Sequence, residues 1–200
     1  MGGFIAYEMA QQLKRQGREI AGLILVDIVA QTQSDLPSYG DDAEELLEVT
    51  REMGTATFSL DSVKDQGHEE RLSYLLGQLI EAKVLAPEIT VPMVRSFLKG
   101  LRRRNQSMID YQLAPYNGPV TLIRAEKGRT TIPAEINSAD PTLGFSSLCS
   151  KVDVAFVPGT HYDLMFPPHV ESLAEAVRKS LQDFDLCQAE AGLQKGYVAV

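Results

Sequence analysis

The chain has 200 residues, of which 44% are hydrophobic and 23% are charged, and its formal net charge is −8. This length and composition predict one soluble globular domain with a core of its own. The acidic balance argues against a nucleic-acid-binding protein, and no apolar stretch approaches the roughly 18 residues that a membrane-spanning helix needs.

The N-terminal part predicts half of an α/β unit. Residues 4–17 are expected to form a helix, because Ile5, Met9 and Leu13 recur at helical spacing. Residues 20–29 are a nearly unbroken apolar run that includes Asp27. Such a run is typical of a strand buried on both faces of a parallel sheet, and a helix followed by a buried strand favours a doubly wound α/β fold.

Charged helical patterns fill the middle of the chain. Residues 31–40 predict a polar linker, and a helical block follows over residues 41–114. We expect its helices at 41–53, 62–83 and 91–113. Because this block stands between strands of a sheet, it is predicted to be an insertion that forms a lid over the site.

The strand pattern then returns at residues 119–125 and 151–158, and a last helix is expected over 170–184. Residues 186–200 show no clear period and are expected to form a C-terminal tail. The two cysteines, Cys149 and Cys187, lack the spacing of metal ligands and predict free thiols. Together with a start that does not read as a signal peptide, they favour a cytoplasmic protein without a metal site.

Two polar residues stand where α/β folds place functional groups. Asp27 ends the first strand, at the edge of the sheet where ligands bind, although a helix cap or a surface aspartate is an equally good interpretation. His161 follows the strand at 151–158 on a glycine-containing turn. The other histidines, His68 and His169, are expected to be solvated.

Three short motifs then show a family resemblance. Met1-Gly2-Gly3 resembles the end of the pattern G-x-S-x-G-G, a strand-to-helix turn that exposes a nucleophilic serine. Leu25-Val26-Asp27 resembles the phrase that carries an acid after the next strand, and Pro158-Gly159-Thr160-His161 resembles the phrase that carries the histidine. In this order the motifs resemble the thioesterase domains of polyketide synthases and non-ribosomal peptide synthetases.

The resemblance implies an α/β fold, namely the C-terminal part of an α/β-hydrolase with a mostly parallel sheet flanked by helices. Residues 1–185 would form the thioesterase domain, with the lid at about 41–114 inserted, and the chain would begin just after the nucleophilic serine. The resemblance makes His161 the general base and Asp27 the acid that orients it. The backbone N–H of Met1 would belong to the oxyanion hole.

The implied reaction releases an acyl or peptidyl chain from the phosphopantetheine thioester of a carrier protein, by hydrolysis or cyclisation. The chain itself is expected to bind no cofactor and, without the serine, to be inactive alone. Glu126 follows the next strand and is the second choice for the acid. Two alternatives stay open, a non-catalytic module that interacts with a carrier protein and another α/β-hydrolase such as an acyltransferase or esterase.

Overall fold

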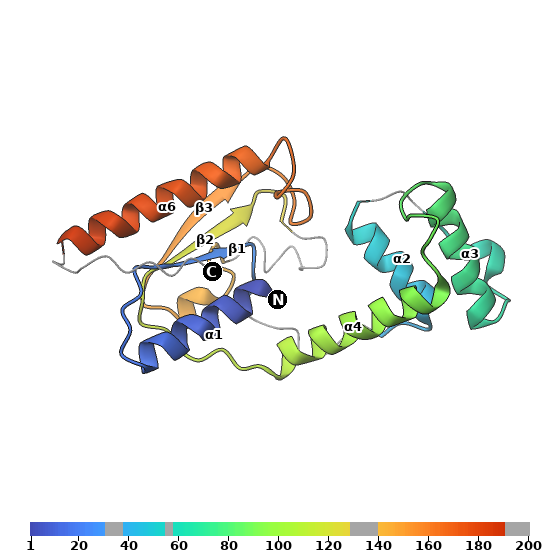
Figure 1. Ribbon diagram of the computed structural model, residues 1–200, viewed down its shortest axis with the longest axis horizontal. Coiled ribbons are helices and arrows are strands. Elements are labelled where there is room, and N and C mark those ends of the chain that lie inside the picture. The colour runs from blue at the N-terminus through green and yellow to red at the C-terminus, as the bar shows by residue number, and fades with distance from the viewer. Residues whose placement is uncertain (31–37, 55–57, 129–139, 191–200) are drawn as a thin grey trace. The chain divides into compact units, whose positions relative to one another are not determined.

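The computed structural model describes residues 1–30, 38–54, 58–128 and 140–190, with side chains to residue 186 (Figure 1). The chain divides into two compact units. Unit 1 comprises Met1–Thr32 and Tyr111–Val200, and unit 2 comprises Gln33–Asp110. Each unit is described by itself.

Unit 1 is built on a three-stranded parallel sheet in the order β1-β2-β3. The strands are β1 (Leu23–Val26), β2 (Val120–Ala125) and β3 (Val152–Val157). Helix α1 (Gly2–Arg15) packs on one face of this sheet and α6 (Val170–Glu190) on the other, and the short helix η2 (Phe145–Ser147) joins the α1 side (Figure 1). The expected fold class, a parallel sheet flanked by helices, is confirmed.

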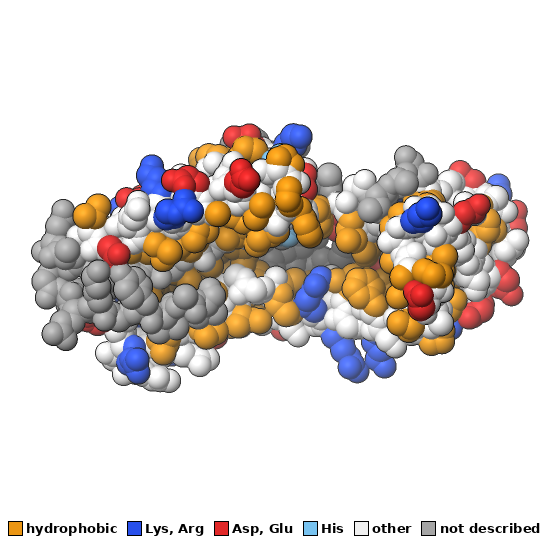
Figure 2. All heavy atoms as spheres, turned by 45° about the horizontal axis from the view of Figure 1, so that its top comes forward, with side chains coloured by type: hydrophobic (Ala, Val, Ile, Leu, Met, Phe, Trp, Pro, Cys, Tyr) orange, Lys and Arg blue, Asp and Glu red, His pale blue; other side chains and the backbone are white. Residues whose placement is uncertain are grey.

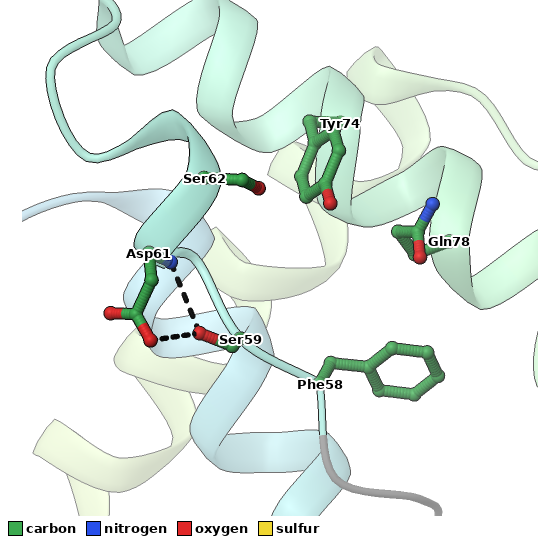
Figure 3. A pocket seen from close by; sticks show the side chains of 6 residues that line it. All are labelled: Phe58, Ser59, Asp61, Ser62, Tyr74 and Gln78. Atoms are coloured by element: carbon green, nitrogen blue, oxygen red, sulfur yellow. Dashed lines mark hydrogen bonds between the residues drawn. The ribbon is translucent and has the colours of Figure 1, made fainter.

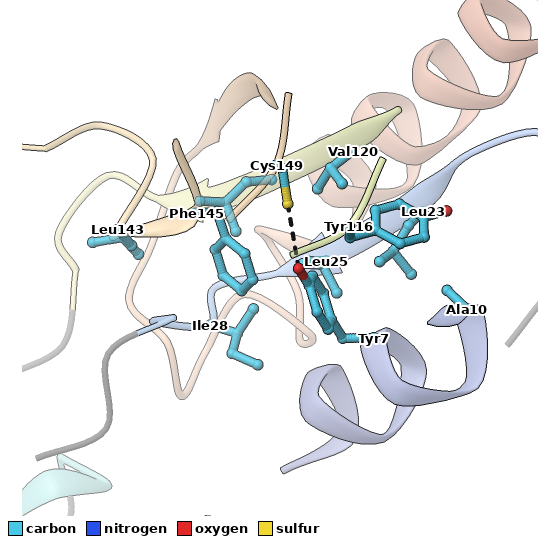
Figure 4. Close-up of a cluster of buried hydrophobic side chains, with 11 residues drawn as sticks. Tyr7, Ala10, Leu23, Leu25, Ile28, Tyr116, Val120, Leu143, Phe145 and Cys149 are labelled. Carbon is cyan, nitrogen blue, oxygen red and sulfur yellow. Dashed lines mark hydrogen bonds between the residues drawn. The ribbon is translucent and has the colours of Figure 1, made fainter. Parts of the chain in front are cut away.

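The core on the α1 side is made of aromatic and aliphatic side chains from several elements (Figure 4). Tyr7 of α1 is fully buried between Tyr116 and Phe145, with ring centroids 5.6 Å and 5.8 Å away. Its hydroxyl donates to the carbonyl of Ala114 at 2.9 Å. A buried phenol thus keeps a hydrogen-bond partner while its ring fills the core.

The central strand is β2, in which all six residues are buried. The prediction that the first strand is buried on both faces is wrong, since β1 has four residues and alternates between buried and half-buried positions. Leu23 and Leu25 face the α1 core, whereas Ile24 and Val26 lie at the edge of the α6 core. The physical reason is position, because within the described residues β1 pairs only with β2.

Unit 2 contains α2 (Asp42–Glu52), η1 (Asp61–Val63), α3 (His68–Glu81) and α4 (Val91–Asp110). The helix predicted over 62–83 is two elements, and α3 begins only after Gly67, its N-cap residue. A leucine-rich core joins the three long helices, and its fully buried leucines are Leu72, Leu75, Leu79 and Leu98. The role of this unit as a lid stays a prediction.

Ion pairs tie the start of α2 to the other helices of unit 2. Asp41 caps α2 by accepting from the N–H of Glu44 at 2.9 Å. Arg71 of α3 lies 3.2 Å from the buried carboxylate of Asp41, and Arg102 of α4 pairs with Glu45 and with Asp42. Breaking a buried pair by removing one partner strongly destabilises a fold, which applies to the largely buried Arg71–Asp41 pair, whereas the half-exposed Arg102 contributes less.

Unit 2 also carries an open pocket of about 320 Å³ (Figure 3). It is lined by Phe58, Ser59, Asp61, Ser62, Tyr74 and Gln78. Among these lining residues, Asp61 carries the carboxylate, and it accepts from the hydroxyl of Ser59 at 2.7 Å. Asp27 and His161 are not among the residues that line this pocket. Across the described ranges, no helix is long and apolar enough to cross a membrane.

The end of the chain differs from expectation. Helix α6 runs on to Glu190, so residues 186–190 continue the helix that was expected to stop at 184. The remainder of the predicted tail lies outside the described residues. Cys149 is a buried free thiol, as predicted, and the side chain of Cys187 also lies outside the described part.

Candidate active site

Asp27 lies at the carboxyl end of β1 in an unusual backbone conformation. Its φ is 46°, in the left-handed region that few residues other than glycine adopt, although aspartate tolerates it better than most. Its N–H donates to the carbonyl of Ile123 at 2.7 Å, and its Oδ1 accepts from the N–H of Ala125 at 3.1 Å. The residue is only 3% exposed, so a carboxylate buried this deeply needs the partners it has.

His161 supplies a further partner of that carboxylate. Its Nδ1 lies 2.8 Å from Oδ2 of Asp27, although the two residues are 134 positions apart in the sequence. An ionised carboxylate only accepts hydrogen bonds, so Nδ1 carries the proton and the lone pair of the neutral ring lies on Nε2. This is the tautomer that a general base needs, with a carboxylate to stabilise the imidazolium when a proton is taken up.

His161 lies in a turn after β3, which places its ring beside Asp27. Its backbone is joined to the loop after β2, because the N–H of Lys127 donates to the carbonyl of Gly159 at 3.0 Å. The N–H of His161 donates in turn to the carbonyl of Gly128 at 3.3 Å. Gly159 has a φ of 101°, which explains why a glycine precedes the histidine by two positions.

Helix α1 begins beside the turn that follows Asp27. A Cβ at Gly3 would lie 2.6 Å from Cδ1 of Ile28, so a larger residue there would have to displace the Ile28 side chain. Figure 1 shows the first turn of α1 at the same end of unit 1 as the carboxyl ends of the strands. Met1 is 42% exposed, and its carbonyl accepts from the N–H of Phe4 at 2.9 Å. Its role in an oxyanion hole stays a prediction.

Glu126, the second choice for the acid, directly follows the end of β2. Glu126 is exposed, and its backbone N–H donates to the carbonyl of Val157 at 2.9 Å. The carboxylate bonded to His161 is that of Asp27. His68 is exposed at the start of α3, as expected.

His169 does not fit the expectation of a solvated residue. Its side chain is 23% exposed, and its Nε2 lies 4.0 Å from Oδ2 of Asp163. The ring of His169 is partly buried because the residues after His161 turn back and place the start of α6 against the turn that carries His161.

Two contacts of the turn that carries His161 were not predicted from the sequence. Asp163 accepts from the N–H of Thr160 at 2.5 Å, and the ring of Tyr162 stands edge-on to that of His161, with centroids 5.2 Å apart. An aspartate three residues after a threonine that precedes a turn is a cap-like signal that could have indicated the first contact. Nothing in the sequence indicates the second.

Two large apolar side chains are exposed close to His161 in the sequence. Met165 and Phe166, a few residues after His161, are 57% and 62% exposed. Figure 2 shows hydrophobic side chains gathered on the face of unit 1 that is turned to the viewer. Within the described ranges, no three His, Cys, Asp or Glu side chains stand together as metal ligands would.

Comparison with known proteins gives a family over most of the chain. A family model described as "Thioesterase domain" matches residues 1–181. A solved structure of the Vlm2 thioesterase domain, bound with a dodecadepsipeptide, is similar with a TM-score of 0.56 and 19% identity, over 89% of this chain and 65% of that one. The NocB thioesterase domain in covalent complex with a fluorophosphonate nocardicin G analogue has a TM-score of 0.49 and 22% identity, over 90% and 62%. The chain therefore spans less than two thirds of the length of these relatives.

Proposed function

The chain belongs to the thioesterase domain family, and from this premise we propose that it supplies the acid and the base of a serine thioesterase. In the proposed reaction an acyl or peptidyl chain leaves the phosphopantetheine thioester of a carrier protein, by hydrolysis or cyclisation. The observation that carries the proposal is the 2.8 Å bond between Nδ1 of His161 and Oδ2 of Asp27.

The proposed nucleophile is a serine directly before Met1. Nε2 of His161 takes the serine proton while the serine oxygen attacks the thioester carbonyl, and the thiolate then leaves with that proton. In the second half, Nε2 takes a proton from water, or from a hydroxyl or amine of the acyl chain. The new oxygen or nitrogen displaces the serine oxygen, which takes that proton back from Nε2. The N–H of Met1 would stabilise the oxyanion in both halves.

Asp27 keeps its charge throughout and stabilises the imidazolium. Its burial strengthens that interaction, because little water screens a carboxylate that is 3% exposed. The exposed side chains of Met165 and Phe166 suit contact with an apolar part of the acyl chain. A peptidyl substrate is favoured by the depsipeptide named for the Vlm2 domain.

The proposed reaction depends on that serine, because Asp27 and His161 supply an acid and a base but no nucleophile. Removing one triad member leaves only oxyanion and binding contributions of about 10³–10⁴ over water.

The test uses the protein extended at its N-terminus by a thioesterase-domain segment that ends in Gly-x-Ser. A fluorophosphonate or an acyl-pantetheine thioester should label that serine, as detected by mass spectrometry of the peptide. His161→Ala should abolish labelling, whereas His68→Ala, a matched change of an exposed histidine in unit 2, should leave it intact. Equal labelling of wild type and His161→Ala would refute the proposal, and binding of carrier protein without labelling would favour a non-catalytic module.

A further inference from the structure

The turn that carries His161 rests on a second carboxylate and a second histidine. Oδ1 of Asp163 accepts from the N–H of Thr160 at 2.5 Å, one residue before His161. The other oxygen of Asp163, Oδ2, lies 4.0 Å from Nε2 of His169 at the start of α6. The set Asp163 and His169, here named the turn support, is separate from the Asp27–His161 pair.

The turn support lies directly against the backbone of the turn. A Cβ at Gly159 would lie 2.4 Å from Oδ1 of Asp163 and 2.8 Å from Cδ2 of His169. Because Gly159 also has a φ of 101°, the backbone there is both bent and in close contact with these two side chains. A change in either side chain therefore alters the surface against which the turn is packed.

Hydrogen bonding from Thr160 favours the ionised form of Asp163. The hydrogen bond from the N–H of Thr160 is the main cause that lowers the pKa of the Asp163 carboxyl, and the positive charges of His169 and Lys127 lower it further. Lys127 belongs to the loop after β2 and its N–H donates to the carbonyl of Gly159. The carboxylate thus lies beside basic side chains from both elements that flank the turn.

We infer that Asp163 and His169 are positioning residues for His161. Asp163 fixes the N–H of Thr160 and thereby the direction from which the imidazole approaches Asp27, and His169 orients the Asp163 carboxylate from α6. The effect on turnover rests on the proposed function, whereas the effect on the geometry of the His161 ring does not.

The structure separates this role from a role in stability. The Asp163 side chain is 47% exposed, so its removal opens no cavity in the core. A misplacement of a catalytic group by about 1 Å, in contrast, costs up to about 10²-fold in rate. Asp163→Ala should therefore affect the His161 ring and catalysis more than the thermal midpoint.

The first experiment is NMR of the His161 ring in the chain of residues 1–200, where no turnover is needed. Asp163→Asn keeps an oxygen that can accept from Thr160, and it should retain the protonated Nδ1 and its slow exchange with solvent. Asp163→Ala removes that acceptor and should speed the exchange, with His169→Ala between the two. Asp183→Ala, an exposed aspartate of α6, is the matched control and should equal wild type.

Kinetics of the serine-containing extended protein complete the test. Asp163→Ala should lower kcat by about 10- to 100-fold with little change in KM, and Asp163→Asn should recover most of the loss. Unchanged exchange in both Asp163→Ala and His169→Ala would overturn the inference. If Asp163→Ala does not fold, the comparison of His169→Ala with Asp163→Asn decides, and equal exchange in those two variants would overturn it. A changed ring signal in the Asp163 variants, together with an extended wild-type protein that contains the serine and still lacks turnover, would sustain the inference and sink the proposed function.

Discussion

The substitution Asp27→Asn tests the site with the least disturbance of the fold. Asparagine has the same shape as aspartate and tolerates the left-handed conformation found at φ 46°. Its Oδ1 can still accept from the N–H of Ala125, a bond that spans 3.1 Å in the structure. What changes is the second atom, where an NH₂ group replaces the oxygen that faces His161 at 2.8 Å.

The consequence for His161 follows from donor and acceptor rules. An amide NH₂ can only donate, so Nδ1 must become the acceptor and the ring proton must move to Nε2. The nitrogen that should take the serine proton is then already protonated. In a serine protease the same substitution lowers kcat on the order of 10⁴-fold, which corresponds to about 5 kcal/mol of transition-state stabilisation.

Two assays follow, one for the tautomer and one for the reaction. Nitrogen-15 NMR should show Nδ1 protonated in the neutral ring of wild type and Nε2 protonated in Asp27→Asn. The serine-containing extended protein should lose acylation rate on the order of 10⁴-fold in Asp27→Asn, whereas Glu126→Gln should have little effect because Glu126 is exposed. A normal rate in Asp27→Asn, with a loss in Glu126→Gln, would show that the acid is Glu126.

Three further predictions concern the packing inside each unit and the ionisation of two tyrosines. Gly22→Ala would place a Cβ 2.2 Å from Cε2 of Phe184, so it should lower the free energy of unfolding by about 1–3 kcal/mol, as measured by denaturant unfolding. Gly77→Ala, at an exposed position of α3, should raise the free energy of unfolding by about 0.5–1 kcal/mol. Leu122→Ala, at a fully buried position of β2, should cost about 2–5 kcal/mol, and a loss below 1 kcal/mol would contradict the described core. Burial raises the pKa of Tyr116 to about 12, and burial together with the hydrogen bond to Glu8 raises that of Tyr111 to about 12. Since an unfolded phenol titrates near 10, these groups stabilise the fold below about pH 10, and that contribution should disappear between about pH 10 and 12; phenolate absorbance that rises fully at pH 10 in the folded protein would contradict this.

Much of the fold could be predicted because its signals are local. The apolar periodicity of α1 and the apolar runs of β2 and β3 need no tertiary information. The burial of β1 could not be predicted in the same way, since an apolar run does not tell a central strand from one at an edge. The break before α3 was missed because Gly67 was read as part of a continuous helix, whereas it is the N-cap residue.

The candidate site shows the same division. Asp27 and His161 could be found because each follows a strand, and the topology of a parallel sheet brings the ends of its strands to one edge. The contact between them depends on a register 134 residues apart, which no local pattern contains. The partial burial of His169 depends on the packing of the start of α6 against the turn that carries His161, a tertiary contact that no local pattern contains.

The end of β2 and the loop after it explain how two distant residues keep a fixed geometry. The carbonyl of Ile123 and the N–H of Ala125 both bond Asp27, one through its backbone and one through its side chain. A few residues on, the carbonyl of Gly128 accepts from the N–H of His161. One short segment, 123–128, therefore holds both the acid and the base, although none of its own side chains belongs to the pair. Because each of these contacts is made by backbone atoms of the segment, side-chain substitutions there can be tolerated while the separation of Asp27 and His161 is preserved.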